Sequence, residues 1–239
     1  MRLSVIPLRD DTPTTRYPIV TVSLIVASSL AFLWTVSLPP HAQQAVIIGL
    51  GLIPARLLGG AELPADLALA SPPMTVLSSM FLHGGWMHLI GNMLYLWIFG
   101  NNVEDAMGHV RFIVFYLLCG LAAALSQALP EPDSTIPMIG ASGAVSGVLG
   151  AYLLLHPHAR VLVLIPIGFI LRLIELPAMV VLGLWFGLQL ISELFAAEGA
   201  GVAFRAHIGG FVAGMILIPF FRRRGVRLFA PPQERWRRF

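Results

Sequence analysis

Apolar residues along the chain fall into six long runs, separated by segments rich in proline, glycine and charged residues. Most of these runs approach the length of about 20 residues at which an α-helix crosses the ~30 Å core of a bilayer. We therefore expect an all-α polytopic membrane protein built as a bundle of six transmembrane helices. In chain order the expected helices are Ile19–Leu38, His83–Phe99, Phe112–Leu129, Ser142–Leu155, Pro177–Phe195 and Ala206–Phe221.

The remaining segments complete the expected layout. Residues 1–18 precede a membrane domain at 19–221, which includes a long outer loop at 39–82, and residues 222–239 form a basic tail. One further apolar run, Val161–Leu171, is too short to span a bilayer and is interrupted by proline and glycine, so it predicts an interfacial or re-entrant loop. The sequence shows no internal repeat and therefore gives no support to an inverted-repeat transporter.

Composition supports a membrane protein. The chain is 57% hydrophobic and 11% charged, whereas an average soluble domain carries about 25% charged residues. A soluble fold of this size could not bury so much apolar surface, and the same figures exclude intrinsic disorder. The single cysteine, Cys119, excludes a disulfide framework and a multi-cysteine metal site.

The basic residues predict the orientation. All 15 are arginines, which excludes lysine nucleophiles and P-loops. With six spans, 13 arginines lie on the side of the termini and two on the other. The positive-inside rule then places both termini in the cytoplasm, and we expect a multi-pass protein of a bacterial inner membrane. The arginine-rich tail suits an anionic lipid surface, and because it lacks stacking aromatic residues we expect no nucleic-acid partner.

Polar residues inside membrane spans are costly and indicate function. His88 and Asn92 lie in the second expected helix, Ser142 begins the fourth, and His207 lies at the start of the sixth. At about 1.5 Å per residue, His88, Ser142 and His207 all lie roughly 20–22 Å above the inner boundary of the core. They therefore share one level, about 8–10 Å below the outer surface.

Small residues predict that two of these helices touch. Small residues spaced by four let helix backbones approach closely in membranes. Two such pairs are Gly143 with Gly147 and Gly210 with Gly214. His207 lies on the same helical face as the second pair, so its imidazole would point toward Ser142 and could act as its general base. Structural roles beside the site are expected for His83, Gly140 and these four glycines.

An oxyanion hole is expected next to the serine. His88 and Asn92 are four residues apart, hence on one helical face, and both can donate hydrogen bonds. The backbone N–H of Ser142 adds a third donor at a helix start, where the helix dipole favours an anion. These three donors fit a tetrahedral intermediate. His83 lies off that face, and we expect it to tie the outer loop to the helix.

The motifs His-x₄-His-x₃-Asn, Gly-x-Ser-Gly and Ala-His-x-Gly-Gly resemble those of the rhomboid intramembrane serine proteases, in the same order and on the same helices. The resemblance implies a rhomboid-like bundle with a Ser142/His207 dyad and no catalytic acid. It also implies an oxyanion hole from His88, Asn92 and the Ser142 backbone. We expect no cofactor and no metal. The implied substrates are membrane-anchored proteins, cleaved near the outer face, with entry gated by the fifth helix and the loop before the sixth.

Two positions stand apart from this pattern. Some rhomboids carry an aromatic residue that packs on the histidine four positions after the serine, whereas this chain has Ser146. Support for His207 must then come from elsewhere. Glu193, near Gln189 in the fifth helix, is a candidate catalytic acid that would add a third member to the dyad. Because the family works with a dyad alone, we expect the Glu193 side chain to lie at the outer interface instead.

Other functions fit the residues less well. A catalytically inactive rhomboid-like protein that binds membrane clients is the alternative, but such a protein would typically lack the serine or the histidine. A channel would line the whole bilayer with polar groups, whereas these cluster in the outer half. A zinc site at His83, His88 and His207 has no nearby carboxylate and no H-E-x-x-H motif. The sequence contains no signature of the oligomeric state.

Overall fold

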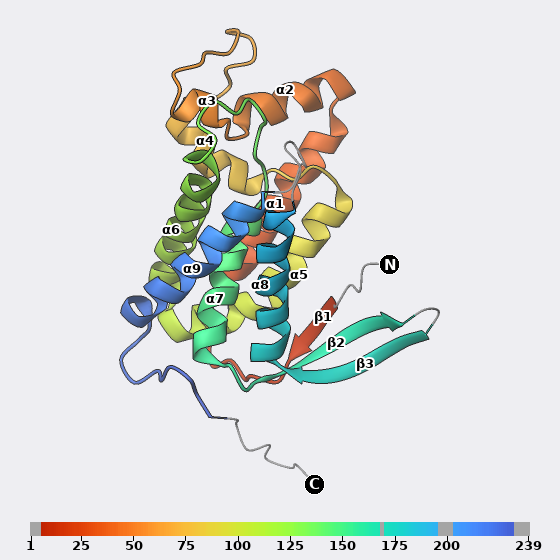
Figure 1. Cartoon of the computed structure of the whole chain (residues 1–239), viewed down its shortest axis with the longest axis vertical. Helices are drawn as coiled ribbons and strands as arrows, with labels where there is room; N and C mark the ends of the chain where they lie inside the picture. The colour runs from red at the N-terminus through yellow and green to blue at the C-terminus, as the bar shows by residue number, and fades with distance from the viewer. Residues whose placement is uncertain (1–5, 168–169, 196–202, 232–239) are drawn as a thin grey trace.

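Helices make up most of the chain and run side by side in a bundle (Figure 1). The structure is a computed structural model that describes residues 6–167, 170–195 and 203–231. Each of the six apolar runs forms a helix, and all but the second lie within three residues of the expected bounds. These helices are α1 (Ile19–Ser37), α5 (Trp86–Met107), α6 (His109–Ala128), α7 (Ser142–Leu155), α8 (Ala178–Leu194) and α9 (Phe204–Phe221).

Length and hydropathy distinguish these helices from one another. Within the described residues, three of them (α1, α6 and α9) are long and apolar enough to cross a membrane on their own, while α7 and α8 are shorter apolar helices. Large apolar side chains such as Leu30 and Trp34 on α1, and Leu184 and Leu188 on α8, are exposed on the outside of the bundle. Such a broad apolar surface is rare on soluble monomers and suits contact with lipid. The count of six spans stays a prediction.

Helix α5 extends eight residues past the predicted end at Phe99. The hydropathy pattern stops there because polar residues follow, but these residues find partners in other elements. The buried carboxylate of Glu104 accepts hydrogen bonds from the backbone N–H groups of Val20 and Thr21, at 2.9 and 2.8 Å. The first N–H groups of a helix lack partners within it, so Glu104 caps the start of α1. Gly108, with φ of +84°, then separates α5 from α6.

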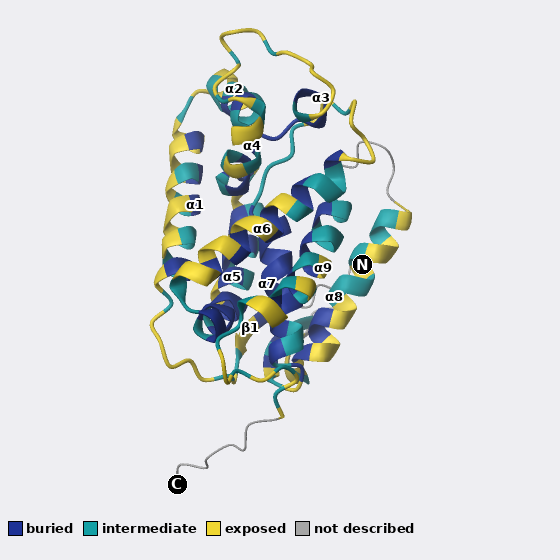
Figure 2. Cartoon of the chain, turned by 90° about the vertical axis from the view of Figure 1, so that its left-hand side faces the viewer, coloured by how far each residue is buried: buried dark blue, intermediate teal, exposed yellow. Residues whose placement is uncertain are grey.

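Helix α7 is the centre of the bundle, and nearly all of its residues are buried (Figure 2). It packs closely against α9 through the predicted glycines. A Cβ atom built on Gly210 would lie 2.0 Å from the carbonyl oxygen of Gly143, and one built on Gly214 would lie 1.9 Å from that of Gly147. No real side chain fits at such distances, so the expected close contact between these two helices is confirmed.

The outer loop predicted at 39–82 contains short helices at one end of the bundle (Figure 1). Each of these helices begins with proline, which is favourable in a first turn because its missing N–H is not needed there. The helices are α2 (Pro40–Leu50), α3 (Pro54–Leu57) and α4 (Pro72–Ser78), followed by a 3₁₀ turn at Ser79–Phe81. They pack above the ends of the long helices at which Ser142 and His207 lie.

A three-stranded antiparallel sheet at the opposite end corrects two predictions. The strands, in sheet order, are β1 (Ile6–Asp10), β2 (Arg160–Ile167) and β3 (Ile170–Pro177). The prediction of a re-entrant loop at Val161–Leu171 is wrong, because these residues pair as strands, and the fold is not purely α-helical. Residues 168–169 lie outside the described part.

The burial pattern explains why strands form here. Val161 and Val163 are fully buried, whereas Leu162 and Leu164 between and after them are only half-buried. This alternation is the period of a strand that is covered on one face. On the edge of β2 that faces away from β3, the backbone N–H and C=O groups pair with β1, which is far away in the sequence.

Candidate active site

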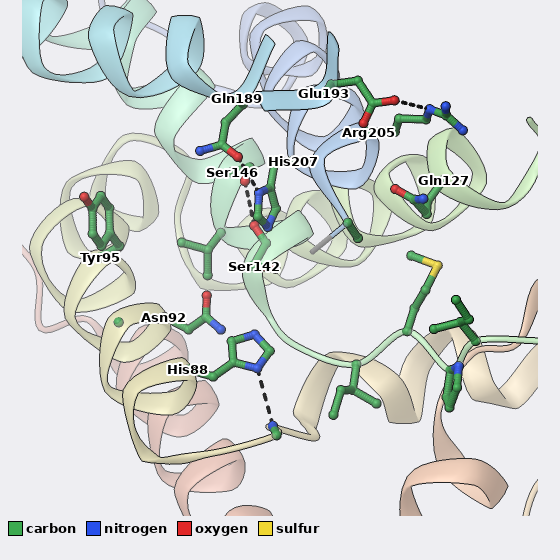
Figure 3. A pocket seen from close by; sticks show the side chains of 18 of the residues that line it. His88, Asn92, Tyr95, Gln127, Ser142, Ser146, Gln189, Glu193, Arg205 and His207 are labelled. Atoms are coloured by element: carbon green, nitrogen blue, oxygen red, sulfur yellow. Dashed lines mark hydrogen bonds and ion pairs between the residues drawn. The ribbon is translucent and has the colours of Figure 1, made fainter. Parts of the chain in front are cut away.

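A cavity of about 790 Å³ opens among the ends of α5, α7, α8 and α9, away from the sheet. The predicted site residues His88, Asn92, Ser142 and His207 all line it (Figure 3). Its volume is that of typical ligand sites. The four residues come from three helices, so the fold brings together what the sequence keeps up to 119 positions apart.

Ser142 and His207 face each other across the contact between α7 and α9. Ser142 is the first residue of α7, and His207 lies in the first turn of α9. A Cβ atom on Gly143 would be 3.7 Å from the carbonyl oxygen of Ala206, so the residues next to the pair are in contact. Figure 3 shows one ring nitrogen of His207 turned toward the Ser142 hydroxyl. Such a pair is able to transfer the serine proton to the imidazole.

The other face of the imidazole is held by helix α8. The Nδ1 atom of His207 lies 2.8 Å from Oε1 of Gln189. The indole of Trp185 packs on the imidazole with ring centres 6.0 Å apart, and the ring of Phe204 meets it edge-on at 6.5 Å. The sequence places Gln189 in this helix but assigns it no role, and it leaves open which element supports His207; Trp185 supplies an aromatic contact from α8.

His88 presents a hydrogen-bond donor beside the serine. Its Nδ1 accepts the backbone N–H of Gly84 at 3.4 Å, which leaves the ring proton on Nε2. A Cβ atom built on Gly140 would lie 2.7 Å from this Nε2 and 3.6 Å from the Ser142 hydroxyl oxygen. Gly140 also has φ of +125°, so glycine is needed there for both space and conformation.

Asn92 adds a second donor one turn further along α5. The side chain is buried, and its Nδ2 atom has no hydrogen-bond partner among the described residues. A buried donor without a partner costs about 1–3 kcal/mol, and such exceptions call for an explanation. A site that receives a negatively charged oxygen provides one.

Comparison with known proteins gives an independent line of evidence. Residues 72–224, well over half of the chain, match the family described as the Rhomboid domain. The chain belongs to the rhomboid family. This rhomboid is accordingly a multi-pass membrane protein, as its apolar helices also indicate.

Several named rhomboids are similar to this chain. Rhomboid protease GluP of Bacillus subtilis is 32% identical over 139 residues, which cover 58% of this chain and 24% of that protein. Rhomboid protein 1, mitochondrial, of Saccharomyces cerevisiae is 30% identical over 152 residues, with coverages of 60% and 40%. RHOMBOID-like protein 5 of Arabidopsis thaliana is 32% identical over 111 residues, with coverages of 46% and 35%. The rhomboid described here spans less than half the length of each.

Ser146 forms its hydrogen bond within α7. Its hydroxyl donates a hydrogen bond of 2.6 Å to the backbone oxygen of Ser142, one turn earlier in α7. A serine that bonds back in this way satisfies itself within its own helix. In this rhomboid, therefore, the aromatic contact to His207 comes from Trp185 and Phe204.

His83 packs behind His88 in the segment that leads into α5. Its side chain is buried, its Nδ1 lies 3.2 Å from the carbonyl oxygen of Phe81, and its ring meets that of His88 edge-on with centres 5.2 Å apart. These contacts connect the end of the outer loop to the first turn of α5.

Glu193 does not reach the imidazole. Its carboxylate accepts a hydrogen bond of 2.5 Å from Nε of Arg205, whose Nη1 lies 2.7 Å from Glu131. This cluster lines the cavity and joins α8, α9 and the segment before α7. The side chain of α8 that hydrogen-bonds to His207 is instead Gln189, one turn earlier. Within the described residues, no three His, Cys, Asp or Glu side chains gather closely enough to hold a metal ion.

Proposed function

We propose that this rhomboid is an intramembrane serine endopeptidase that uses Ser142 as nucleophile and His207 as general base. The observation that carries the proposal is a single one. The serine hydroxyl, the imidazole and two further hydrogen-bond donors, on His88 and Asn92, converge on one cavity.

In the first step, Oγ of Ser142 attacks the carbonyl carbon of a peptide bond and forms the C–O bond. Its proton passes to Nε2 of His207, and the carbonyl oxygen becomes an oxyanion. Nε2–H of His88, the Asn92 amide and the backbone N–H of Ser142 donate to that oxyanion. The backbone N–H is free for this because Ser142 begins α7. Collapse of the intermediate breaks the C–N bond, and the proton on His207 leaves with the amine.

In the second step, water replaces the amine. His207 takes a proton from the water, the resulting hydroxide attacks the acyl carbon, and Ser142 leaves with that proton restored. The same donors stabilise the second oxyanion. The chain needs no other group for this sequence, since each proton moves between the serine, the imidazole, the water and the leaving amine.

The location of the site suggests the class of substrate. The first turns of α7 and α9 line the cavity, the sheet follows the opposite end of α7, and the outer faces of the surrounding helices are apolar. A membrane-anchored protein can reach it from the lipid, so we propose cleavage near the outer face of the substrate's membrane segment. We propose a bacterial inner membrane as the location, and the arginine distribution supports an orientation with both termini in the cytoplasm.

The test is cleavage of a model single-span protein by the purified rhomboid in liposomes. We expect cleavage by the wild type, none by Ser142→Ala or His207→Ala, and unchanged melting of both variants. Leu30→Ala, on the lipid-facing side of α1, is the matched control and should cleave normally. A wild type that binds the model protein without cutting it would support the alternative, an inactive rhomboid-like protein that binds clients.

A further inference from the structure

One face of helix α8 contacts the first turn of α9. Trp185, Gln189 and Glu193 are spaced by four residues and therefore share a face. Trp185 packs on His207, Gln189 bonds to His207, and Glu193 pairs with Arg205. Leu184, Leu188 and Ile191, which lie on other sides of the helix, are exposed.

Gln189 is the polar residue of this face that meets the proposed general base. A polar side chain on an apolar helix is costly unless it finds a partner. The partner here is Nδ1 of His207, at 2.8 Å from the amide oxygen. An amide oxygen only accepts hydrogen bonds, so Nδ1 must carry the ring proton. The lone pair is then on Nε2, the nitrogen that faces Ser142 in Figure 3.

We propose that Gln189 is a positioning residue that holds His207 in the base-competent tautomer and orientation, in place of a catalytic acid. The proposal rests on the serine-protease function above and deepens it. A neutral amide fixes the ring without adding a charge inside the bilayer, where a carboxylate would be far more costly to place. The indole of Trp185 restricts the same ring from its face, so α8 fixes the imidazole in two directions.

The test uses a fluorophosphonate, which reacts with an activated serine without any protein substrate. Oγ of Ser142 forms a bond to phosphorus, fluoride leaves, and the serine proton passes to His207. The labelling rate of the purified protein in lipid is measured against pH for the wild type, Gln189→Leu and Gln189→Glu. Leu188→Ala, next along α8 but exposed, is the matched control.

We expect Gln189→Leu to label about 10- to 100-fold more slowly, since a misplacement of about 1 Å costs up to ~10² in rate. Its melting temperature and that of Leu188→Ala should stay close to the wild type. Gln189→Glu should restore labelling, because a carboxylate also accepts from Nδ1. It should move the midpoint of the pH–rate profile to higher pH, because a negative charge favours the protonated imidazole.

Two results would overturn the proposal. One is wild-type labelling by Gln189→Leu. The other is a loss that Gln189→Glu does not restore and that leaves the pH midpoint in place, since this would mean that Gln189 only packs. Failure of the proposed function itself looks different, because the wild type would then label no faster than Ser142→Ala.

Discussion

At the scale of single residues, the neighbouring side chains and one glycine fix the surroundings of Ser142 and His207. Gly140 leaves room for the imidazole of His88 next to the serine, and Gln189 holds the far nitrogen of His207. The sequence predicted the four polar residues because polar groups in apolar runs are conspicuous. It did not single out Gln189, because its partner lies on another helix and only the spacing from Trp185 to Glu193 suggests a shared face.

Asn92 provides a prediction about the oxyanion. Removal of one such donor lowers kcat by up to about 10²–10³-fold, so we expect Asn92→Ala to lower kcat in this range while KM changes little. Asn101→Ala, at the far end of the same helix, is the matched control and should retain wild-type kinetics. If Asn92→Ala raised KM and left kcat unchanged, Asn92 would belong to the substrate path.

Asp10 in β1 predicts a dependence of stability on pH. Burial raises the pKa of its carboxyl above 3.8, although hydrogen bonds from Tyr152 and Thr12 oppose this shift. The folded chain therefore binds the proton more tightly than the unfolded chain, and protonated Asp10 stabilises the fold. This contribution to stability is fully present below pH 3.8 and is lost as the pH rises through the pKa of the folded state.

Asp10→Asn is neutral at every pH and lacks this loss. The melting temperature of the variant minus that of the wild type should therefore increase as the pH rises from about 4 to about 7. The measurement is a series of thermal melts of both proteins in the same detergent or lipid. A difference that stays constant or falls with pH would contradict the effect assigned to Asp10.

At the scale of elements, the sequence predicts the helices well and the sheet poorly. An apolar run that ends at proline or polar residues predicts α1 and α7 almost to the residue. The proline and glycine that interrupt the apolar run favour a loop, whereas the alternation of Val161 and Val163 with their neighbours is the signal that indicates strand β2. Its pairing with β1 joins residues about 150 positions apart, which no local pattern reveals.

The contact between α7 and α9 predicts the effect of adding a methyl group. A Cβ atom on Gly210 would lie 2.0 Å from the Gly143 backbone, so Gly210→Ala must push the helices apart. We expect a lower melting temperature and a loss of activity of about 10²-fold or more, because Ser142 and His207 separate with the helices.

Gly183→Ala is the matched control for this substitution. Nothing lies within 4 Å of a Cβ atom at Gly183, in α8. Since alanine favours a helix by up to about 1 kcal/mol over glycine, melting should be unchanged or slightly higher. Equal behaviour of Gly210→Ala and Gly183→Ala would contradict the close contact.

At the scale of the whole molecule, the sheet and the site lie at opposite ends of the bundle (Figure 1). Strand β1 and residues 222–231 both lie at the sheet end, where the N–H of Arg223 bonds to the carbonyl oxygen of Ala106. An even number of crossings would place them on one side of the membrane, as the arginine distribution predicts.

Thiol labelling tests this orientation. In a background with Cys119→Ala, Glu62→Cys in the outer segment and Arg172→Cys in β3 introduce one exposed cysteine each. We expect an impermeant maleimide to label Glu62→Cys on intact cells and Arg172→Cys only after the membrane is opened. The reverse pattern would place the site on the cytoplasmic side.

The central claim is that Ser142 and His207 act as one chemical unit, and a double-mutant cycle tests it most directly. Cleavage rates in liposomes are measured for Ser142→Ala, His207→Ala and the double variant, all at wild-type melting temperature. Because a nucleophile without its base is as ineffective as a base without its nucleophile, the double variant should be no slower than either single variant. Independent losses that multiply in the double variant, or cleavage by Ser142→Ala near the wild-type rate, would contradict the account.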